Sequence, residues 1–311
     1  MLSEVFYWLF NMSIVASLAG LIVLLLRLIK KLPRRVTVIL WAIPFLRMWI
    51  PVGIGGKYGL MTFLSKFTTR TVTVFEIQNN YDLTDLPGFT MTNSVMAANS
   101  YFPITYKINL VGEVFTVASI VWAVVCAALL LTFVILYVVT LREVKSATHL
   151  YDNVYSSDKV SSPAIYGVFR PKIVIPAAMA EKEDLRYILM HEQKHIGRLD
   201  NLWRILGFAT AALHWFNPFV WIFLKCFLSD LEIACDEAVL QKYSEEDKKK
   251  YALALLGVAE SKTVFLSAFG GAKIKTRIEH ILSYKKMTAL AAVAFAVLVA
   301  FIAYFLLTNA S

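Results

Sequence analysis

Three long runs without a charged residue constrain this chain more than any other feature. They cover residues 5–26, 114–141 and 287–307, and each is long enough to cross the roughly 30 Å hydrocarbon core of a bilayer as a helix. A fourth run, residues 36–52, is shorter and contains Arg47 and two prolines. It can cross a membrane only if Arg47 reaches the interface or faces protein. We therefore expect a membrane protein with four helical spans.

The positions of lysine and arginine predict how these spans are oriented. Cytoplasmic segments are enriched in basic residues, and residues 27–35 contain five while residues 142–286 contain 21. The loop before the third span contains only four, so both termini are expected outside. The predicted organisation is two spans with a basic cytoplasmic turn in residues 1–52, an extracellular loop in 53–113, a third span in 114–141, a cytoplasmic domain in 142–286, and a fourth span with a short outside tail in 287–311.

The segment 142–286 is long enough for one domain, and its pattern changes from strand to helix. Residues 164–178 combine aromatic and β-branched side chains with glycine and proline, which is typical of strands. Residues 181–200 have acids first and then apolar side chains at helical spacing. The stretch KIVIP, residues 172–176, is either an edge strand that binds a peptide by strand addition or an ordinary packed strand. The predicted fold class is a multi-span α-helical membrane protein with an inserted cytoplasmic α+β domain.

The helical part contains HEQKH at residues 191–195. On a helix, His191 and His195 lie one turn apart on the same face and can direct two imidazoles at one ion. Glu192 can then reach a water molecule on that ion. This H-E-x-x-H pattern is the signature of zincin metallopeptidases, with Glu192 as the general base. The alternative is a solvent-exposed helix face that carries two surface histidines.

A zinc site needs a third protein ligand, and LSDLEIACDEAVL provides a candidate. Glu232 and Asp236 lie one turn apart within an expected helix over residues 229–243. With Glu232 as the ligand, Asp236 is placed to orient one of the zinc-bound histidines. Two alternatives remain. Glu232 is an exposed helix acid, or Cys235 binds the ion as a thiolate in its place.

Residues 203–227 test this assignment, because they are apolar enough to form a fifth span. A straight helix of that length would be roughly 36 Å long. It would place His195 and Glu232 on opposite sides of the bilayer, where no ion could bind both. Pro218 in HWFNP disfavours a continuous helix, so a hairpin that returns the chain to the same side is expected. At this break His214 either helps to hold a developing oxyanion or is a structural histidine.

With these features the chain resembles the BlaR/MecR-type membrane zinc metallopeptidases, the family of β-lactam sensor-transducers. The stretches that carry the resemblance are YGVFRPKIVIP (166–176), HEQKH (191–195), HWFNPFVW (214–221) and LEIACDEAVL (231–240). The resemblance implies a gluzincin-like cytoplasmic metallopeptidase domain between the third and fourth spans. It implies His191, His195 and Glu232 as zinc ligands and Glu192 as the general base. It also implies self-cleavage linked to loss of a DNA-binding repressor.

The sequence departs from the best-known members of that family after the fourth span. Those members continue into a penicillin-binding domain, whereas here four residues follow residue 307. Two S-x-x-K matches, at Ser156 and Ser283, fall in the expected cytoplasmic segment. We therefore expect no β-lactam sensing by acylation, and a signal that enters through residues 53–113, the spans or a partner protein.

The expected function is that of a membrane zinc metalloendopeptidase in signal transduction by regulated proteolysis. It would cleave itself near residues 267–269, a cytoplasmic BlaI/MecI-like repressor, or both. The alternative for residues 267–269 is a flexible connector. The expected partners are a peptide or protein substrate, membrane lipids and, in a homodimer, a second copy of the chain; direct contact with nucleic acid is not expected. Alternative functions are a quality-control protease, a non-catalytic receptor or scaffold, and a transporter lined by Arg47 and residues 203–227.

Overall fold

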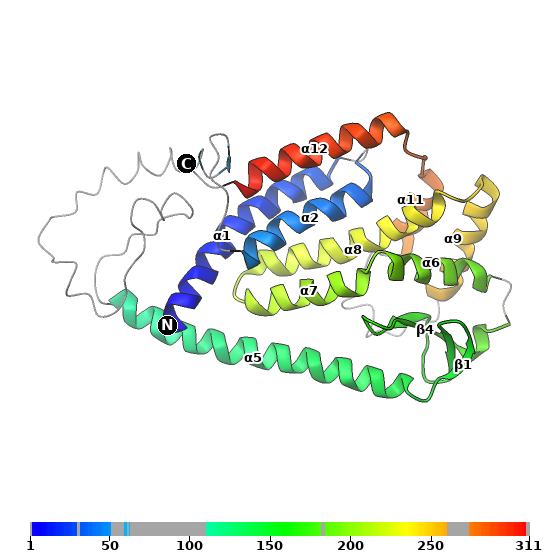
Figure 1. Ribbon diagram of the computed structural model, residues 1–311, viewed down its shortest axis with the longest axis horizontal. Helices are drawn as coiled ribbons and strands as arrows, with labels where there is room; N and C mark the ends of the chain where they lie inside the picture. Colours follow the sequence, from blue (N-terminus) through cyan, green and yellow to red (C-terminus); the bar gives the residue numbers. More distant parts are fainter. Residues whose placement is uncertain are drawn as a thin grey trace, which may run out of the picture.

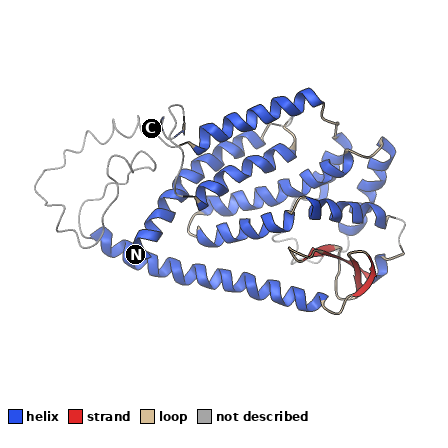
Figure 2. Ribbon diagram, in the orientation of Figure 1, coloured by secondary structure: helices blue, strands red, loops and turns tan. Residues whose placement is uncertain are grey.

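The protein is mostly helical and has one small sheet (Figures 1 and 2). The computed structural model describes residues 2–29, 32–50, 59–60, 62, 110–181, 184–259 and 274–308. The elements in chain order are α1 (Leu2–Arg27), α2 (Arg34–Trp49), α5 (Leu110–Val144), β1 (Thr148–Tyr151), β2 (Val154–Ser157), β3 (Ala164–Tyr166), β4 (Lys172–Pro176), the 3-10 helix η2 (Ala177–Met179), α6 (Leu185–Gly197), α7 (Asp200–Leu213), α8 (Pro218–Leu240), α9 (Glu245–Ala259), α11 (Ile274–Ser283) and α12 (Ala289–Leu307).

Three helices of the described chain are long and apolar enough to cross a membrane. They are Leu2–Arg27, Val114–Arg142 and Ala289–Leu307, and they coincide with the three uncharged runs of the sequence. Half of the first helix is buried inside the protein, whereas little of the other two is. The three uncharged runs therefore form helices long enough to cross a membrane, and α5 and α12 present most of their apolar surface outward.

The predicted span over residues 36–52 corresponds to α2, which is only 16 residues long. Such a helix measures about 24 Å, less than the hydrocarbon core. It packs against α1, α8 and α12 (Figure 1). Arg47 is buried, and its guanidinium donates to the carbonyls of Leu306 and Thr308 at the end of α12. Because helix C-terminal carbonyls lack intrahelical partners and carry partial negative charge, they stabilise Arg47, which faces protein as the prediction required.

Helices α7 and α8 form a hairpin, as expected from HWFNP, and not a fifth span (Figure 1). Pro218 takes the first helical position of α8, and the Asn217 side chain accepts from the N–H of Phe219 as its N-cap. The same amide donates to the hydroxyls of Ser13 and Ser17, which ties the turn to α1. The chain therefore returns toward α6, and the start of α7 and the end of α8 lie at the same end of the bundle.

The sheet has the strand order β1-β2-β4-β3. Strand β4, which is KIVIP, pairs in parallel with β2 and antiparallel with β3. The suggestion that KIVIP is a free edge strand is therefore wrong, because both of its edges are hydrogen-bonded. Ile173 and Ile175 are fully buried and pack with Leu185 and Leu189 of α6. The sheet thus supports the helix that carries HEQKH.

Two predicted features cannot be placed in this fold. The loop over residues 53–113 lies almost entirely outside the described residues, and the proposed cleavage site at residues 267–269 lies wholly outside them.

Candidate metal centre

Helix α6 brings His191 and His195 together in the interior. The apolar residues of α6 pack on the sheet and on α9, which buries the histidine face between them. The exposed fractions of His191 and His195 are 4% and 3%, and their Nε2 atoms lie 3.1 Å apart. The alternative of two surface histidines is contradicted by this burial.

The other ring nitrogen of each histidine is held by a partner from elsewhere. Nδ1 of His195 lies 2.6 Å from an oxygen of Asp200, and a carboxylate there accepts the Nδ1 proton. Nδ1 of His191 lies 2.8 Å from the hydroxyl of Tyr251 and 3.3 Å from Asp236. Since Tyr251 donates its own proton to Asp236 at 2.6 Å, its oxygen accepts from His191. Both Nε2 atoms therefore lie side by side as acceptors, with the Nδ1 side of each ring held by a polar partner, as in carboxylate–histidine–metal sites.

Glu232 of α8 faces the two Nε2 atoms. Its carboxylate oxygens lie 3.7 Å from Nε2 of His191 and 3.7 Å from Nε2 of His195. Zinc binds imidazole nitrogen at about 2.0–2.1 Å in tetrahedral sites, which separates two ligand atoms by about 3.3 Å. The observed separations are close to this value, so the three side chains fit a zinc ion.

Two arginines complete the cluster. Arg277 of α11 donates to both oxygens of Asp236, at 2.8 Å from Nε and 2.7 Å from Nη2, and its Nη1 lies 3.4 Å from Glu232. Arg204 of α7 donates to the other oxygen of Glu232. Both carboxylates are therefore fixed by guanidinium groups from helices that the H-E-x-x-H pattern does not identify.

The electrostatics of the cluster favour positive charge on the imidazoles. Burial lowers the pKa of His195, but Cys235 and Glu232 outweigh it and raise that pKa to about 10. Burial also lowers the pKa of His191. Cys235 and Asp236 outweigh this effect and raise that pKa well above its ordinary value. Burial raises the pKa of Asp236, but the Arg277 guanidinium overcomes this and holds it far below the usual range. A divalent cation supplies positive charge at this position while leaving the imidazoles neutral for coordination.

Cys235 is a second candidate for the third ligand. Its sulfur, together with one ligand atom from each histidine, forms a group in which all atoms lie within 4.8 Å of one another. However, the fully buried thiol donates to the backbone carbonyl of His191, whereas Glu232 faces both Nε2 atoms and is 16% exposed. The imidazoles lower the pKa of Cys235 to about 7 against the effect of burial. The 3.7 Å distances from the Glu232 oxygens to both Nε2 atoms favour Glu232 as the third ligand.

The structure places the other predicted site residues differently. Glu192 lies next to His191 on α6 and is partly exposed. His214 is fully buried at the far end of α7, where its Nε2 lies 3.1 Å from the carbonyl of Met48. Since α7 has 14 residues and begins at Asp200, about 20 Å of helix separates His214 from the cluster. The prediction that His214 assists at the reacting carbonyl is contradicted by this position, which fits a structural histidine.

Four residues of the centre were not predicted: Asp200, Arg204, Tyr251 and Arg277. Asp200 follows the motif closely in HIGRLDN, and a lone arginine in the apolar run of α7 is a signal that marks Arg204. Tyr251 and Arg277 carry no such signal, because their helices look like ordinary amphipathic helices.

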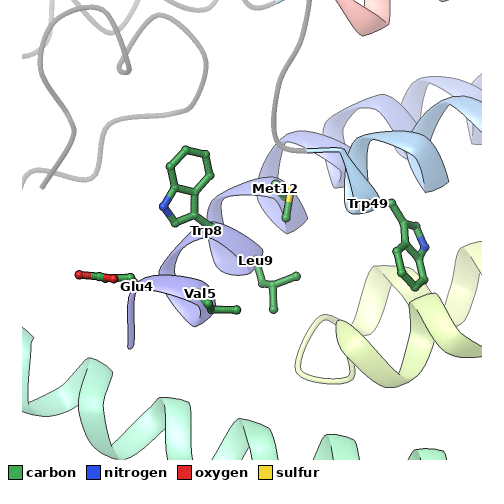
Figure 3. A pocket seen from close by; sticks show the side chains of 6 residues that line it. All are labelled: Glu4, Val5, Trp8, Leu9, Met12 and Trp49. Carbon is green, nitrogen blue, oxygen red and sulfur yellow. The ribbon is translucent and has the colours of Figure 1, made fainter. Parts of the chain in front are cut away.

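The pocket in Figure 3 is lined by Glu4, Val5, Trp8, Leu9, Met12 and Trp49. It lies at the N-terminal end of α1, away from the residues of the centre.

Comparison with known proteins identifies the family to which the chain is similar. The family described as BlaR1 peptidase M56 matches residues 7–281. The regulatory protein BlaR1 of Bacillus licheniformis is 30% identical over 127 residues, which cover 40% of this chain and 21% of that protein. The methicillin resistance mecR1 protein of Staphylococcus aureus is 26% identical over 144 residues, which cover 43% of this chain and 24% of that protein. The mecR1 protein of Staphylococcus epidermidis matches to the same extent. The matched segments thus span less than a quarter of each curated relative.

Proposed function

This chain belongs to the BlaR1 peptidase M56 family, and from that premise we propose that it is a membrane zinc metalloendopeptidase that acts in signal transduction by regulated proteolysis. The zinc ligands are His191, His195 and Glu232. The observation that carries the proposal is that two buried Nε2 atoms and one carboxylate lie within 3.7 Å of one another. Each of the three side chains is also held in place by a hydrogen bond to a further polar side chain.

The chemistry divides between the ion and the residues of α6. A zinc ion bound here supplies Lewis-acid activation of a water molecule and of the scissile carbonyl. Glu192 accepts a proton from water and delivers it to the leaving amine, as a general base and then a general acid. Asp200 and the pair of Tyr251 and Asp236 keep both histidines in the tautomer that leaves Nε2 free.

The distribution of lysine and arginine supports a cytoplasmic location for the site. The basic turn between α1 and α2 and the segment from Arg142 to α12 lie in the cytoplasm, with both termini outside. The α7–α8 hairpin supports this topology, because it keeps His195 and Glu232 on one side of the bilayer. A cytoplasmic site gives access to a cytoplasmic repressor, and the curated relatives are a regulatory protein and a methicillin resistance protein.

Self-cleavage is supported by the helices on either side of residues 260–273. Tyr251 of α9 and Arg277 of α11 both contact the centre, so the helices on both sides of this segment are anchored there. Residues 267–269 lie eight to ten residues before Arg277 in the sequence, and the five residues from position 269 to the start of α11 span at most about 17 Å when extended. The proposed cleavage site is therefore within reach of the metal in the same molecule.

Metal analysis and peptide cleavage test the proposal. The purified full chain should bind one zinc ion and cleave candidate cytoplasmic repressors. Glu192→Gln should keep the metal and lose about 10²- to 10⁴-fold in cleavage rate, the range for removal of a general base. A folded wild-type protein without bound metal, or an unchanged rate in Glu192→Gln, would contradict the proposal.

The third ligand is tested by a matched pair on α8. Glu232→Ala should weaken zinc binding strongly, whereas Cys235→Ser should keep it. The reverse result would assign the ion to Cys235.

Intact-mass measurement tests self-cleavage separately. Wild-type protein should yield fragments that break near residues 267–269, and Glu192→Gln should stay intact. A wild-type protein that keeps the mass of the full chain, as Glu192→Gln does, would remove self-cleavage while leaving peptide hydrolysis untouched.

A further inference from the structure

An apolar surface lies where the turn between β3 and β4 meets the start of α7. It consists of exposed side chains on one face of α7, Leu202, Trp203 and Leu206, together with Leu199 just before the helix. In the turn, Phe169 is 99% exposed. The Asn201 side chain donates to the carbonyls of Ile165 and Gly167, at 3.3 Å and 3.1 Å. These bonds hold the turn beside the first turn of α7.

The turn is tight and keeps Phe169 at its tip. Gly167 has φ +89, and a Cβ at this position would lie 3.0 Å from the carbonyl oxygen of Arg170. Only glycine adopts this conformation readily, so the direction of the turn is fixed by the backbone. Arg170 next to Phe169 is exposed and basic, and Lys172 two residues further along is exposed, with its ammonium 4.5 Å from the ring centre of Tyr155. A fully exposed phenyl group flanked by cations is costly in water and suited to a lipid headgroup region.

Contacts between α7 and α5 give the depth of this surface. The ring of Phe208 lies 5.4 Å from that of Phe133, and the carbonyl of Leu213 accepts from the indole of Trp122. At 1.5 Å per residue, Asn201 lies about 10 Å from Phe208 and about 18 Å from Leu213 along α7. Along α5 these contacts run from Trp122 to Phe133, toward Arg142, so α7 runs antiparallel to α5 and its start lies toward the Arg142 end.

The membrane-crossing part of α5 ends at Arg142. Asn201, and the turn that it holds, therefore lie toward this end of the span. Figure 1 shows the sheet beside this end of α5.

We propose that Phe169 and the exposed face of residues 199–206 form a membrane-contact surface that inserts into the leaflet at the Arg142 end of α5. The partner is a lipid surface with anionic headgroups, which Arg170 and Lys172 contact while Phe169 and Trp203 enter the acyl boundary. Asn201 follows Asp200, which holds His195, so the surface fixes the metal centre at the membrane. This inference depends on the spans and not on peptidase activity.

Lipid-attached quenchers measure the contact directly. Phe169→Cys in the full chain is labelled with an environment-sensitive fluorophore and placed in nanodiscs with spin-labelled lipid. Glu246→Cys on α9, at a site that is 77% exposed, is the matched control. Glu246 comes after the end of α8, and that end lies about 12 Å along the helix from Glu232, on the side away from the α7–α8 turn. Wild-type protein labelled in parallel gives the background from the three native cysteines.

The probe at position 169 should be quenched several-fold more by spin-labelled lipid than the probe at position 246. Anionic lipid should increase this quenching over neutral lipid. Equal quenching at both positions, or a probe at position 169 that is quenched by aqueous iodide and not by lipid, overturns the proposal.

Discussion

At the residue scale, the centre depends on side chains that join different helices. One guanidinium, that of Arg277, contacts the carboxylate that orients His191 and the carboxylate that faces both imidazoles. Charge-assisted, forked hydrogen bonds of this kind fix geometry as well as adding energy. The H-E-x-x-H pattern predicts which atoms face the ion, but it contains no information about the groups behind them.

We expect Arg277→Met to weaken zinc binding by about 10- to 100-fold, the usual effect of removing a group that holds a metal ligand in place. Lys275→Met is the control, because Lys275 lies on the same helix, is 86% exposed and, among the described residues, forms an ion pair only with Glu279, at 3.9 Å. Competition with a chromophoric chelator measures both affinities. An equal zinc affinity in Arg277→Met and wild type would show that Arg277 does not position the ligands.

His214 shows a second limit at this scale. A histidine beside a helix break can be catalytic or structural, and the sequence is the same in both cases. We expect His214→Gln to keep wild-type zinc affinity and cleavage rate, because the amide can still donate to the carbonyl of Met48. Titration and a peptide assay check this. A loss of cleavage with unchanged zinc binding would restore a catalytic role.

At the element scale, the turn between α7 and α8 reverses the direction of the chain. The Asn217 side chain caps α8 and donates to two hydroxyls of α1. The sequence predicts the break from Pro218, but not the contacts with Ser13 and Ser17 that hold it. KIVIP is the opposite case, since its β-branched residues predict a strand and cannot tell a central strand from an edge.

We expect Asn217→Ala to destabilise the protein by about 1–3 kcal/mol, because it removes an N-cap and buried hydrogen bonds between helices. Asn217→Ser keeps a capping oxygen and is too short to reach α1, so its loss should be smaller. Thermal unfolding in detergent compares the two. Equal stability of all three proteins would rule out this role for Asn217.

At the scale of the whole molecule, the centre brings together α6, α8, α9 and α11, with α7 alongside. Removal of the metal should therefore affect the fold. A ligand that binds only the folded state stabilises it by about 2.7 kcal/mol at 100 times its Kd. We expect chelation to lower Tm and added zinc to restore it, with Glu232→Ala unresponsive to both. A wild-type Tm that does not change when zinc is removed or added would contradict the proposal that a metal ion joins these helices.

Topology is the second prediction at this scale. If the hairpin holds, a cysteine at Lys225 should react with a membrane-impermeant reagent only from the side that exposes Lys275. Reaction of Lys225→Cys from the opposite side would require a fifth span and would separate His195 from Glu232.

The sequence alone determined the three long spans, the hairpin at Pro218 and the pair His191 and His195, because these follow from local periodicity and length. It also pointed to Glu232, which lies one turn before another acid. Only the tertiary structure decided that Arg277 and Tyr251 belong to the same centre, that KIVIP lies inside the sheet and that His214 lies far away. These depend on contacts between segments remote in the chain, and hydrophobic periodicity specifies which face of a helix is buried without specifying its neighbour.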